Sequence, residues 1–325
     1  MDPEHLKREI ESAQMPLDKL KGELEALESG SFSSLGDDEL REKVKQIHTG
    51  FVVQAPILPE GTLIYRAVRV TQRPSSKAHI SYPPPEVVNK CGRCSRAGEV
   101  IFYGALNQFA SCLQECSWRP SEFFAVSAWL TKEKMAFNHL GYSTVVLKSF
   151  KALRELPYFA TIHNDSDRNL LIRDWQAKIF TQRVPSGDEH LYRLPITLKE
   201  AALWKIGQPH PTGPDLLSGI IYPSIAMWAL GDNVAILPSE VDKKMALLEV
   251  ILLTLDSVDL ISKDDGSTDT RMQVKTYDYA REGDDGRLVW GQRTQIIHPD
   301  GVDASTFSPQ ILPPDSVSTP NKFEQ

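Results

Sequence analysis

The chain has 325 residues, a net charge of −7, 41% hydrophobic residues and 24% charged residues, which is the composition of a folded globular protein. The acidic balance disfavours nucleic-acid binding, because that binding depends on Lys and Arg neutralising phosphates. No secretory signal is visible, and the longest apolar run, MALLEVILLTL over 245–255, is too short to cross a bilayer and carries Glu249. We therefore expect a buried strand at 245–255 in a cytoplasmic protein with no membrane or nucleic-acid partner.

The first fifty residues are predicted to form an N-terminal helical extension. One helix is expected from Pro16 and a second from Gly36 to Gly50, because apolar residues recur at steps of three and four. Their stripes consist of Leu17, Leu20, Leu24 and Leu27, followed by Leu40, Val44 and Ile47. We expect these stripes to pack on the main body, and the alternative is a partner-binding or self-association surface that would make a homo-oligomer.

Residues 51–296 are predicted to form one α+β domain, because short strands and helices alternate without a regular period. Residues 81–88 contain three consecutive prolines and are expected to be extended. The tail over 297–325 is polar, contains prolines and is expected to be poorly ordered. The predicted strands are 62–70, 99–106, 143–150 and 234–237, the predicted helices are 106–118, 165–183 and 198–205, and a hairpin is expected over 270–294 with its turn at Glu-Gly-Asp-Asp-Gly.

All four cysteines lie in one stretch as Cys-x2-Cys, a seventeen-residue gap and Cys-x3-Cys. Cys91, Cys94, Cys112 and Cys116 have spacing that suits a structural zinc ion joining a turn to a helix. The alternative is that each thiol is a small buried apolar group. The zinc interpretation would make the chain a zinc-stabilised interaction module without catalysis.

The residues around these cysteines resemble the RES domain family. That family has an early Arg, a Gly-Arg turn, a Phe-Tyr strand, a helix with Glu, and a late Gly-Ile-x-Tyr-Pro-Ser followed by Gly-x-Asn. The resemblance covers most of 51–295 and departs from the family at Cys94, Cys112 and Cys116. The matching residues, in chain order, are Arg66, Arg93, Tyr103, Glu115, Ser224 and Asn233.

This resemblance implies a fold similar to the ADP-ribosyltransferase toxins of the diphtheria type. It implies an NAD-consuming toxin or effector that cleaves the nicotinamide–ribose bond, as a glycohydrolase or phosphorylase, or that transfers ADP-ribose to a protein. NAD would be a substrate and not a cofactor, and the sequence contains no glycine-rich dinucleotide loop. An antitoxin or immunity protein is the implied partner, and effectors of this kind include some exported without a cleavable signal.

The resemblance also implies a role for one carboxylate. Cleavage of the nicotinamide–ribose bond passes through an oxocarbenium-like state, which a fixed negative charge stabilises. Glu115 is the candidate for that charge, and Ser224 would hold the ribose or orient Glu115. Asn233 would contact NAD from the closing segment. The structural alternative for Ser224 is a helix cap.

Aromatic and cationic side chains are the remaining candidates for NAD binding. Tyr103, with Tyr65 and Tyr82, could stack on the flat nicotinamide. Arg66 and Arg93 suit the pyrophosphate, because a guanidinium is planar and forms paired hydrogen bonds. Taken singly, each has a structural alternative: tyrosine as core and arginine as a salt-bridge partner.

Overall fold

The computed structural model describes residues 12–51, 56–106, 122–144, 166–185, 187–203, 217–224, 232–262 and 268–291. Residue contacts divide the chain into two units. The first unit combines 1–58, 88–99 and 135–225, and the second combines 59–87, 100–134 and 226–325. Each unit is therefore assembled from stretches that are far apart in the sequence.

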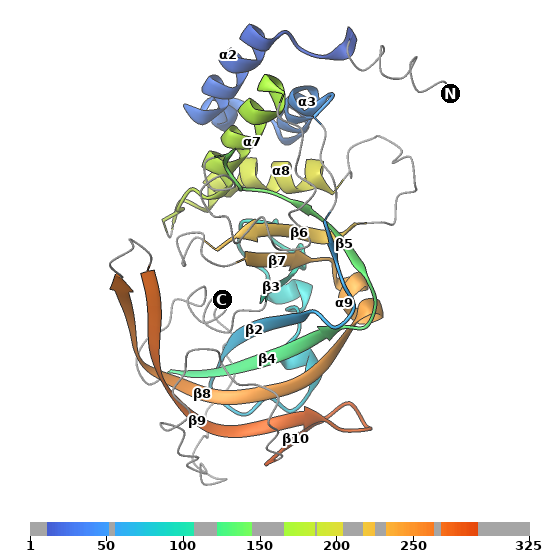
Figure 1. Cartoon of the computed structure of the whole chain (residues 1–325), viewed down its shortest axis with the longest axis vertical. Coiled ribbons are helices and arrows are strands. Elements are labelled where there is room, and N and C mark those ends of the chain that lie inside the picture. The colour runs from blue at the N-terminus through green and yellow to red at the C-terminus, as the bar shows by residue number, and fades with distance from the viewer. Residues whose placement is uncertain are drawn as a thin grey trace. The chain divides into compact units, whose positions relative to one another are not determined.

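The described part of the first unit is mainly helical (Figure 1). Its strands run in the order β1-β5-β6, with β1 antiparallel to β5 and β6 parallel to it. The elements are α2 (Leu17–Glu28), η1 (Ser31–Ser34), α3 (Asp37–His48), β1 (Ile57–Leu58), β5 (Met135–His139), α7 (Asp167–Phe180), η4 (Glu189–Tyr192), α8 (Arg193–Ala202) and β6 (Leu217–Pro223).

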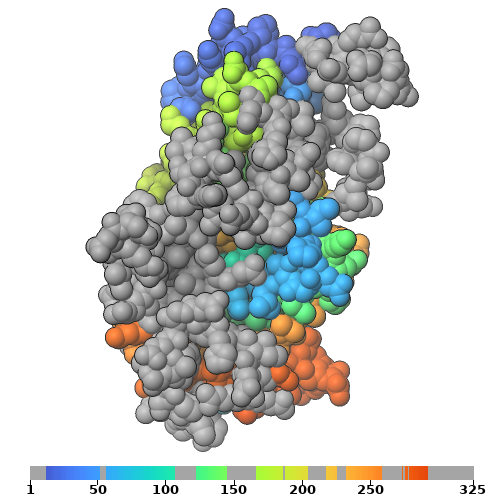
Figure 2. Space-filling model, in the orientation of Figure 1, coloured from blue at the N-terminus to red at the C-terminus, as the bar shows by residue number. Residues whose placement is uncertain are grey.

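The two N-terminal helices pack inside the first unit, as their apolar stripes predict. Helix α2 contacts α7, and α3 contacts α8. Figure 2 shows the α2 and α7 surfaces in contact, blue against yellow-green. The residues that the stripes bury are Leu20, Leu24, Leu27, Leu40, Val44 and Ile47. The expectation that 1–50 also serves self-association stays a prediction.

Helix α7 also binds the end of α3 through hydrogen bonds. Arg168 donates from Nη1 to the Met15 carbonyl at 2.8 Å, and from Nη2 to the carbonyls of Ile47 and Thr49 at 3.1 and 3.2 Å. The last carbonyls of a helix have no hydrogen-bond partner within the helix. A cation that lies at this end can donate to them. His48 is half-buried beside them, and its Nδ1–H donates to the Val44 carbonyl while its Nε2 accepts from Gln176.

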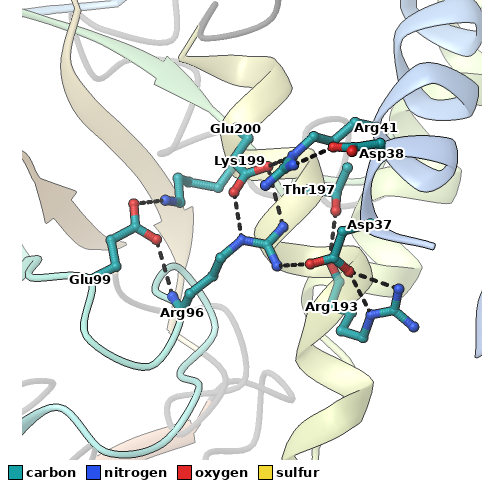
Figure 3. A network of polar contacts seen from close by, with 9 residues as sticks. All are labelled: Asp37, Asp38, Arg41, Arg96, Glu99, Arg193, Thr197, Lys199 and Glu200. Atoms are coloured by element: carbon teal, nitrogen blue, oxygen red, sulfur yellow. Dashed lines mark hydrogen bonds and ion pairs between the residues drawn. The ribbon is translucent and has the colours of Figure 1, made fainter.

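A network of charged side chains joins α3 and α8 (Figure 3). Arg193 binds Asp37 at 2.8 Å, and Arg96 binds both Asp37 at 2.7 Å and Glu200 at 2.9 Å. Arg41 reaches the other side of Glu200, also at 2.9 Å. Burial opposes ionisation of Glu200, but hydrogen bonds from Arg96 and Arg41 outweigh it and lower the pKa of this carboxyl. The network therefore complements the apolar stripes in holding the extension.

The described part of the second unit is mainly antiparallel sheet. Its strands follow the order β7-β3-β2-β4-β8-β9-β10, and every pairing given for them is antiparallel. The long strands β8 and β9 curve together (Figure 1). The elements are β2 (Leu63–Val70), η2 (Lys77–His79), η3 (Pro85–Val87), β3 (Phe102–Leu106), β4 (Phe123–Thr131), β7 (Asp232–Ile236), α9 (Pro238–Lys244), β8 (Met245–Ser262), β9 (Thr268–Glu282) and β10 (Leu288–Trp290).

The predicted α+β class is confirmed, together with the strand over 245–255 and the hairpin of β9 and β10. The prediction that all of 81–88 is extended is wrong, because residues 85–87 form the turn η3. Pro85 opens that turn, where its missing N–H removes no hydrogen bond. Most of the helix expected at 106–118, most of the strand at 143–150 and all of the tail at 297–325 lie outside the described residues. Among the residues that the structure describes, no helix has both the length and the apolar character that crossing a membrane requires.

The half-buried His48 and the buried His139 are expected to make the first unit sensitive to mild acid. Burial, reinforced by Arg168, lowers the pKa of His48 from 6.5 to about 4, and burial beside Arg173 lowers the pKa of His139 to about 4. Between pH 6.5 and 4 the unfolded chain therefore binds protons that the folded chain does not, so stability falls as the pH falls. The expected loss is on the order of 3 kcal/mol for each histidine.

Chemical denaturation at several pH values between 7 and 4 measures this dependence. His48→Gln should flatten it, whereas the same change at the exposed His190 should leave it unaltered. A His48→Gln protein with the slope of the original chain would contradict the assignment.

The pair formed by Lys199 and Glu99 is expected to behave as a buried ion pair. The ammonium of Lys199 has no exposed side-chain surface and lies 2.6 Å from Glu99. Glu99→Gln should lower the free energy of unfolding by roughly 3 kcal/mol, because it leaves that charge buried and uncompensated. The double variant Glu99→Gln/Lys199→Met should recover most of the loss, as measured by denaturant titration.

Glu42→Gln, in an exposed pair with Lys45, is the control and should change stability by less than about 1 kcal/mol. Equal losses in the single and double variants would contradict this account.

Candidate functional site

The register of the second unit's sheet brings three polar side chains onto one face. Tyr65 in β2 lies opposite Ala105 in β3 and Ala128 in β4. Ala105 in turn lies opposite Asn233 in β7, and Ala128 lies opposite Glu249 in β8. Directly opposed residues of antiparallel strands project from the same side of the sheet. Asn233, Tyr65 and Glu249 therefore form one row across five strands.

Tyr103 lies on the same face in the adjoining row. It is two residues from Ala105, so its side chain projects to the same side, diagonally adjacent to Tyr65. Its partner across β7 is Ala235. Each tyrosine thus has an alanine as a cross-strand neighbour. We name Tyr65, Tyr103, Asn233 and Glu249 the tyrosine face.

The tyrosine face lies within an apolar part of the sheet. Tyr65 packs in a cluster with Phe124, Val126 and Ile251. Asn233 and Glu249 are buried with Tyr65, whereas Tyr103 is only half-buried. Small-molecule sites are lined mainly by apolar and aromatic side chains with a few polar groups, and the tyrosine face has that composition. The structural alternative is a sheet core in which these polar groups have protein partners.

Arg66 projects from the opposite face of β2. It is adjacent to Tyr65 in the strand and lies opposite Ser127 in β4, so its side chain points away from the tyrosine face. Its Nε donates to the Ser81 carbonyl and its Nη1 donates to the Tyr103 carbonyl, both at 2.9 Å. Its guanidinium carbon lies 5.4 Å from the centre of the Phe102 ring. Arg66 therefore fixes the backbone of β3 at Tyr103, and its predicted contact with pyrophosphate stays a prediction.

The segment from Lys77 to Ser81 covers the Arg66 side of the sheet. The Ser127 hydroxyl accepts from the Trp129 indole at 2.8 Å and donates to the Arg66 carbonyl at 3.1 Å. The ammonium of Lys77 lies 5.3 Å from the centre of the Trp129 ring. The cation–π contact thus attaches this segment to β4, and the hydrogen bond from Arg66 to the Ser81 carbonyl attaches it to β2.

Tyr82 follows that segment and is bound to α9. Its hydroxyl donates to Asp242 at 2.7 Å, and this hydrogen bond raises the pKa of the phenol. The contact fixes the ring at its hydroxyl end. Stacking of Tyr82 on nicotinamide stays a prediction.

Arg93 and Ser224 belong to the first unit. Arg93 donates to the carbonyls of Phe180 and Gln182 at the end of α7, and its guanidinium lies over the rings of Phe180 and Tyr192. These contacts are those of a cation that caps a helix C-terminus. Ser224 follows β6 and is buried. The predicted roles of both residues toward NAD stay predictions.

Two of the four cysteines of the proposed zinc site lie within the described residues. Cys91 is half-buried and Cys94 is buried, in a turn closed by a hydrogen bond from Gly92 N–H to the Ser95 carbonyl at 2.8 Å. Cys112, Cys116 and Glu115 lie outside the described residues. Within the described ranges, no three His, Cys, Asp or Glu side chains are grouped as metal ligands.

Glu249 is the site residue that motif reasoning missed. It is the one acid in MALLEVILLTL, a run otherwise made of apolar residues and threonine. Charged residues are almost never fully buried unless they are paired, so an acid inside a predicted core strand is itself a signal. The sequence alone does not show which strand pairs with this run. That pairing determines the face of the sheet on which the acid lies.

The contacts of Arg66 predict a structural effect from its replacement. Arg66→Lys should lower the free energy of unfolding by roughly 1–3 kcal/mol, because an ammonium cannot reproduce the two divergent hydrogen bonds to backbone carbonyls. Arg287→Lys, at an exposed ion pair with Asp285, is the matched control and should change stability by less than about 1 kcal/mol. Denaturant titration of both variants measures the difference, and a fully stable Arg66→Lys protein would contradict the role given to Arg66.

Comparison with models of known protein families and with curated protein sequences finds no match to the chain. The chemistry of the tyrosine face is therefore argued from its own residues.

Proposed function

We propose that this chain is an enzyme that consumes NAD by cleaving the bond between nicotinamide and ribose. The proposal joins the ordered motif residues of the sequence to the geometry of the tyrosine face. The observation that carries it is that Tyr65, Tyr103 and Asn233, chosen from three separate motifs, project from one face in two adjoining rows. Arg66 projects from the opposite face, so in this proposal it is a positioning residue that holds the backbone of Tyr103 through its hydrogen bond.

The side chains of this face suit the parts of NAD that react. A phenol ring offers nicotinamide an aromatic surface, and an amide offers both a donor and an acceptor to its carboxamide. The apolar neighbours exclude water, which strengthens electrostatic interactions with a developing positive charge. In this scheme Glu115 supplies a negative charge at the ribose, as the motif predicts.

Release of nicotinamide from NAD by the purified chain tests the proposal. Tyr103→Leu should lower kcat/KM by roughly 10- to 100-fold, because the leaving group loses its stacking partner and its alignment. Phe123→Leu is the matched control, since Phe123 is half-buried on the opposite face of the same sheet and lies opposite Val70. It should retain the original rate.

The acceptor of ADP-ribose distinguishes the forms of the activity. A rate that depends on inorganic phosphate indicates a phosphorylase, and a rate independent of phosphate indicates a glycohydrolase. Transfer of label from NAD to one protein of a lysate supports an ADP-ribosyltransferase instead. Absence of both nicotinamide release and transfer would contradict the proposal.

A further inference from the structure

We infer that Trp290 is a positioning residue of the proposed NAD site, because it holds a strap of the chain that fixes Arg66 and, through Arg66, the backbone of Tyr103. We name residues 73–82 the strap. This inference rests on the proposed function and adds a residue that lies outside the tyrosine face. All the contacts that carry it lie within the second unit.

The register of the sheet puts Arg66 and Trp290 at the two ends of one row. Arg66 in β2 lies opposite Ser127 in β4, and Ser127 lies opposite Val250 in β8. Val250 lies opposite Ala280 in β9, which in turn lies opposite Trp290 in β10. Directly opposed residues project from the same side of an antiparallel sheet. The row therefore crosses five strands on the face opposite the tyrosine face (Figure 1).

Both ends of this row donate hydrogen bonds to the strap. The indole Nε1–H of Trp290 donates to the Pro74 carbonyl, and Nε of Arg66 donates to the Ser81 carbonyl, both at 2.9 Å. The strap thus crosses this face of the sheet from β10 to β2. Further contacts attach it along the way, namely Leu288 N–H to the Ser75 carbonyl at 2.9 Å, Arg73 to Asp278 in β9 at 2.8 Å, and the Lys77 ammonium at 5.3 Å from the centre of the Trp129 ring in β4.

The burial of the strap is concentrated at its two ends. Its buried residues are Pro74, Ile80 and Ser81, and three of the residues between them are exposed. Segments with few buried contacts are held by their individual attachments and open at low cost. The position of the strap is therefore set where Trp290 and Arg66 bind it, and the loss of either attachment should shift it.

Arg66 connects the strap to the proposed site. Its guanidinium donates in two directions, to the Ser81 carbonyl in the strap and to the Tyr103 carbonyl in β3. Because a guanidinium is planar and rigid, a displaced Ser81 carbonyl reorients the donor that holds Tyr103. In the proposed reaction Tyr103 aligns the leaving group, and a misplacement of about 1 Å can slow a reaction roughly 100-fold. The position of the strap is thus expressed at Tyr103.

Trp290→Phe tests the inference, because it removes the indole N–H and keeps an aromatic ring for the guanidinium of Arg73, which lies 5.8 Å from the ring centre. It should lower kcat for nicotinamide release by about 3- to 10-fold, the range expected from one hydrogen bond, while KM changes by less than about 2-fold. Val289→Ala is the matched control and should retain kcat. Val289 is the exposed neighbour of Trp290 in β10 and projects from the other face.

A double-variant cycle with Arg66→Lys separates positioning from general destabilisation. In the Arg66→Lys chain the connection between the strap and Tyr103 is already broken. Adding Trp290→Phe should therefore lower kcat further by less than about 1.5-fold. Two effects on kcat that simply multiply would overturn the inference, because they would show that Trp290 does not act through Arg66.

Hydrogen exchange measures the same connection without relying on activity. In Trp290→Phe the amides of β3 should exchange about 3- to 10-fold faster than in the original chain, whereas those of β5 in the first unit should keep their rates. Unchanged exchange in β3 would overturn the inference, and so would an active original chain with an unaltered kcat in Trp290→Phe. An original chain that releases no nicotinamide would instead overturn the proposed function, and with it the positioning role of Trp290.

Discussion

The pairing of β2 with β3 on one side and β4 on the other is the constraint on which the candidate site depends. Side chains alternate between the two faces of a strand, so a shift of one residue in either pairing would move Tyr65 away from Asn233 or from Glu249. Arg66 opposes such a shift, because it is a residue of β2 and its side chain donates a hydrogen bond to the Tyr103 carbonyl in β3. Gly104 reinforces the same contact, since a Cβ there would lie only 2.6 Å from Cγ2 of Ile64.

The first unit relies on a different balance of forces. Its N-terminal helices bury apolar stripes through the non-directional hydrophobic effect, and the network of Asp37, Arg96 and Glu200 then restricts how α3 packs on α8. Hydrophobic burial supplies attraction, while hydrogen-bonded charges specify geometry. The extension is consequently part of the unit's packing, whatever other surface it presents.

Local features were predictable from the sequence, and pairing between strands was not. The steps of three and four among Leu20, Leu24 and Leu27 depend on one helix alone, so they predicted α2 directly. The motif order placed Arg66 and Tyr103 in strands, but their opposite faces follow from the β2–β3 register, which no local pattern contains. Glu249 was hidden for the same reason, because its row becomes visible only when β4 pairs with β8. Pro85 shows the converse, since a proline run that favours extended backbone also suits the first position of a turn.

The choice between a core and a site on the tyrosine face turns on how polar groups are distributed in it. A sheet core satisfies its backbone within the ladder and needs no side-chain polarity, so Val, Ile and Leu fill it at the lowest cost. The second unit follows that rule at Phe124, Val126, Ile251 and Leu253, all on this face. It departs from the rule where Tyr65, Asn233 and Glu249 align in one row with alanines between them. The alanines of that row are buried as well, so a ligand that reaches this face has to approach it at Tyr103, the one half-buried member of the tyrosine face.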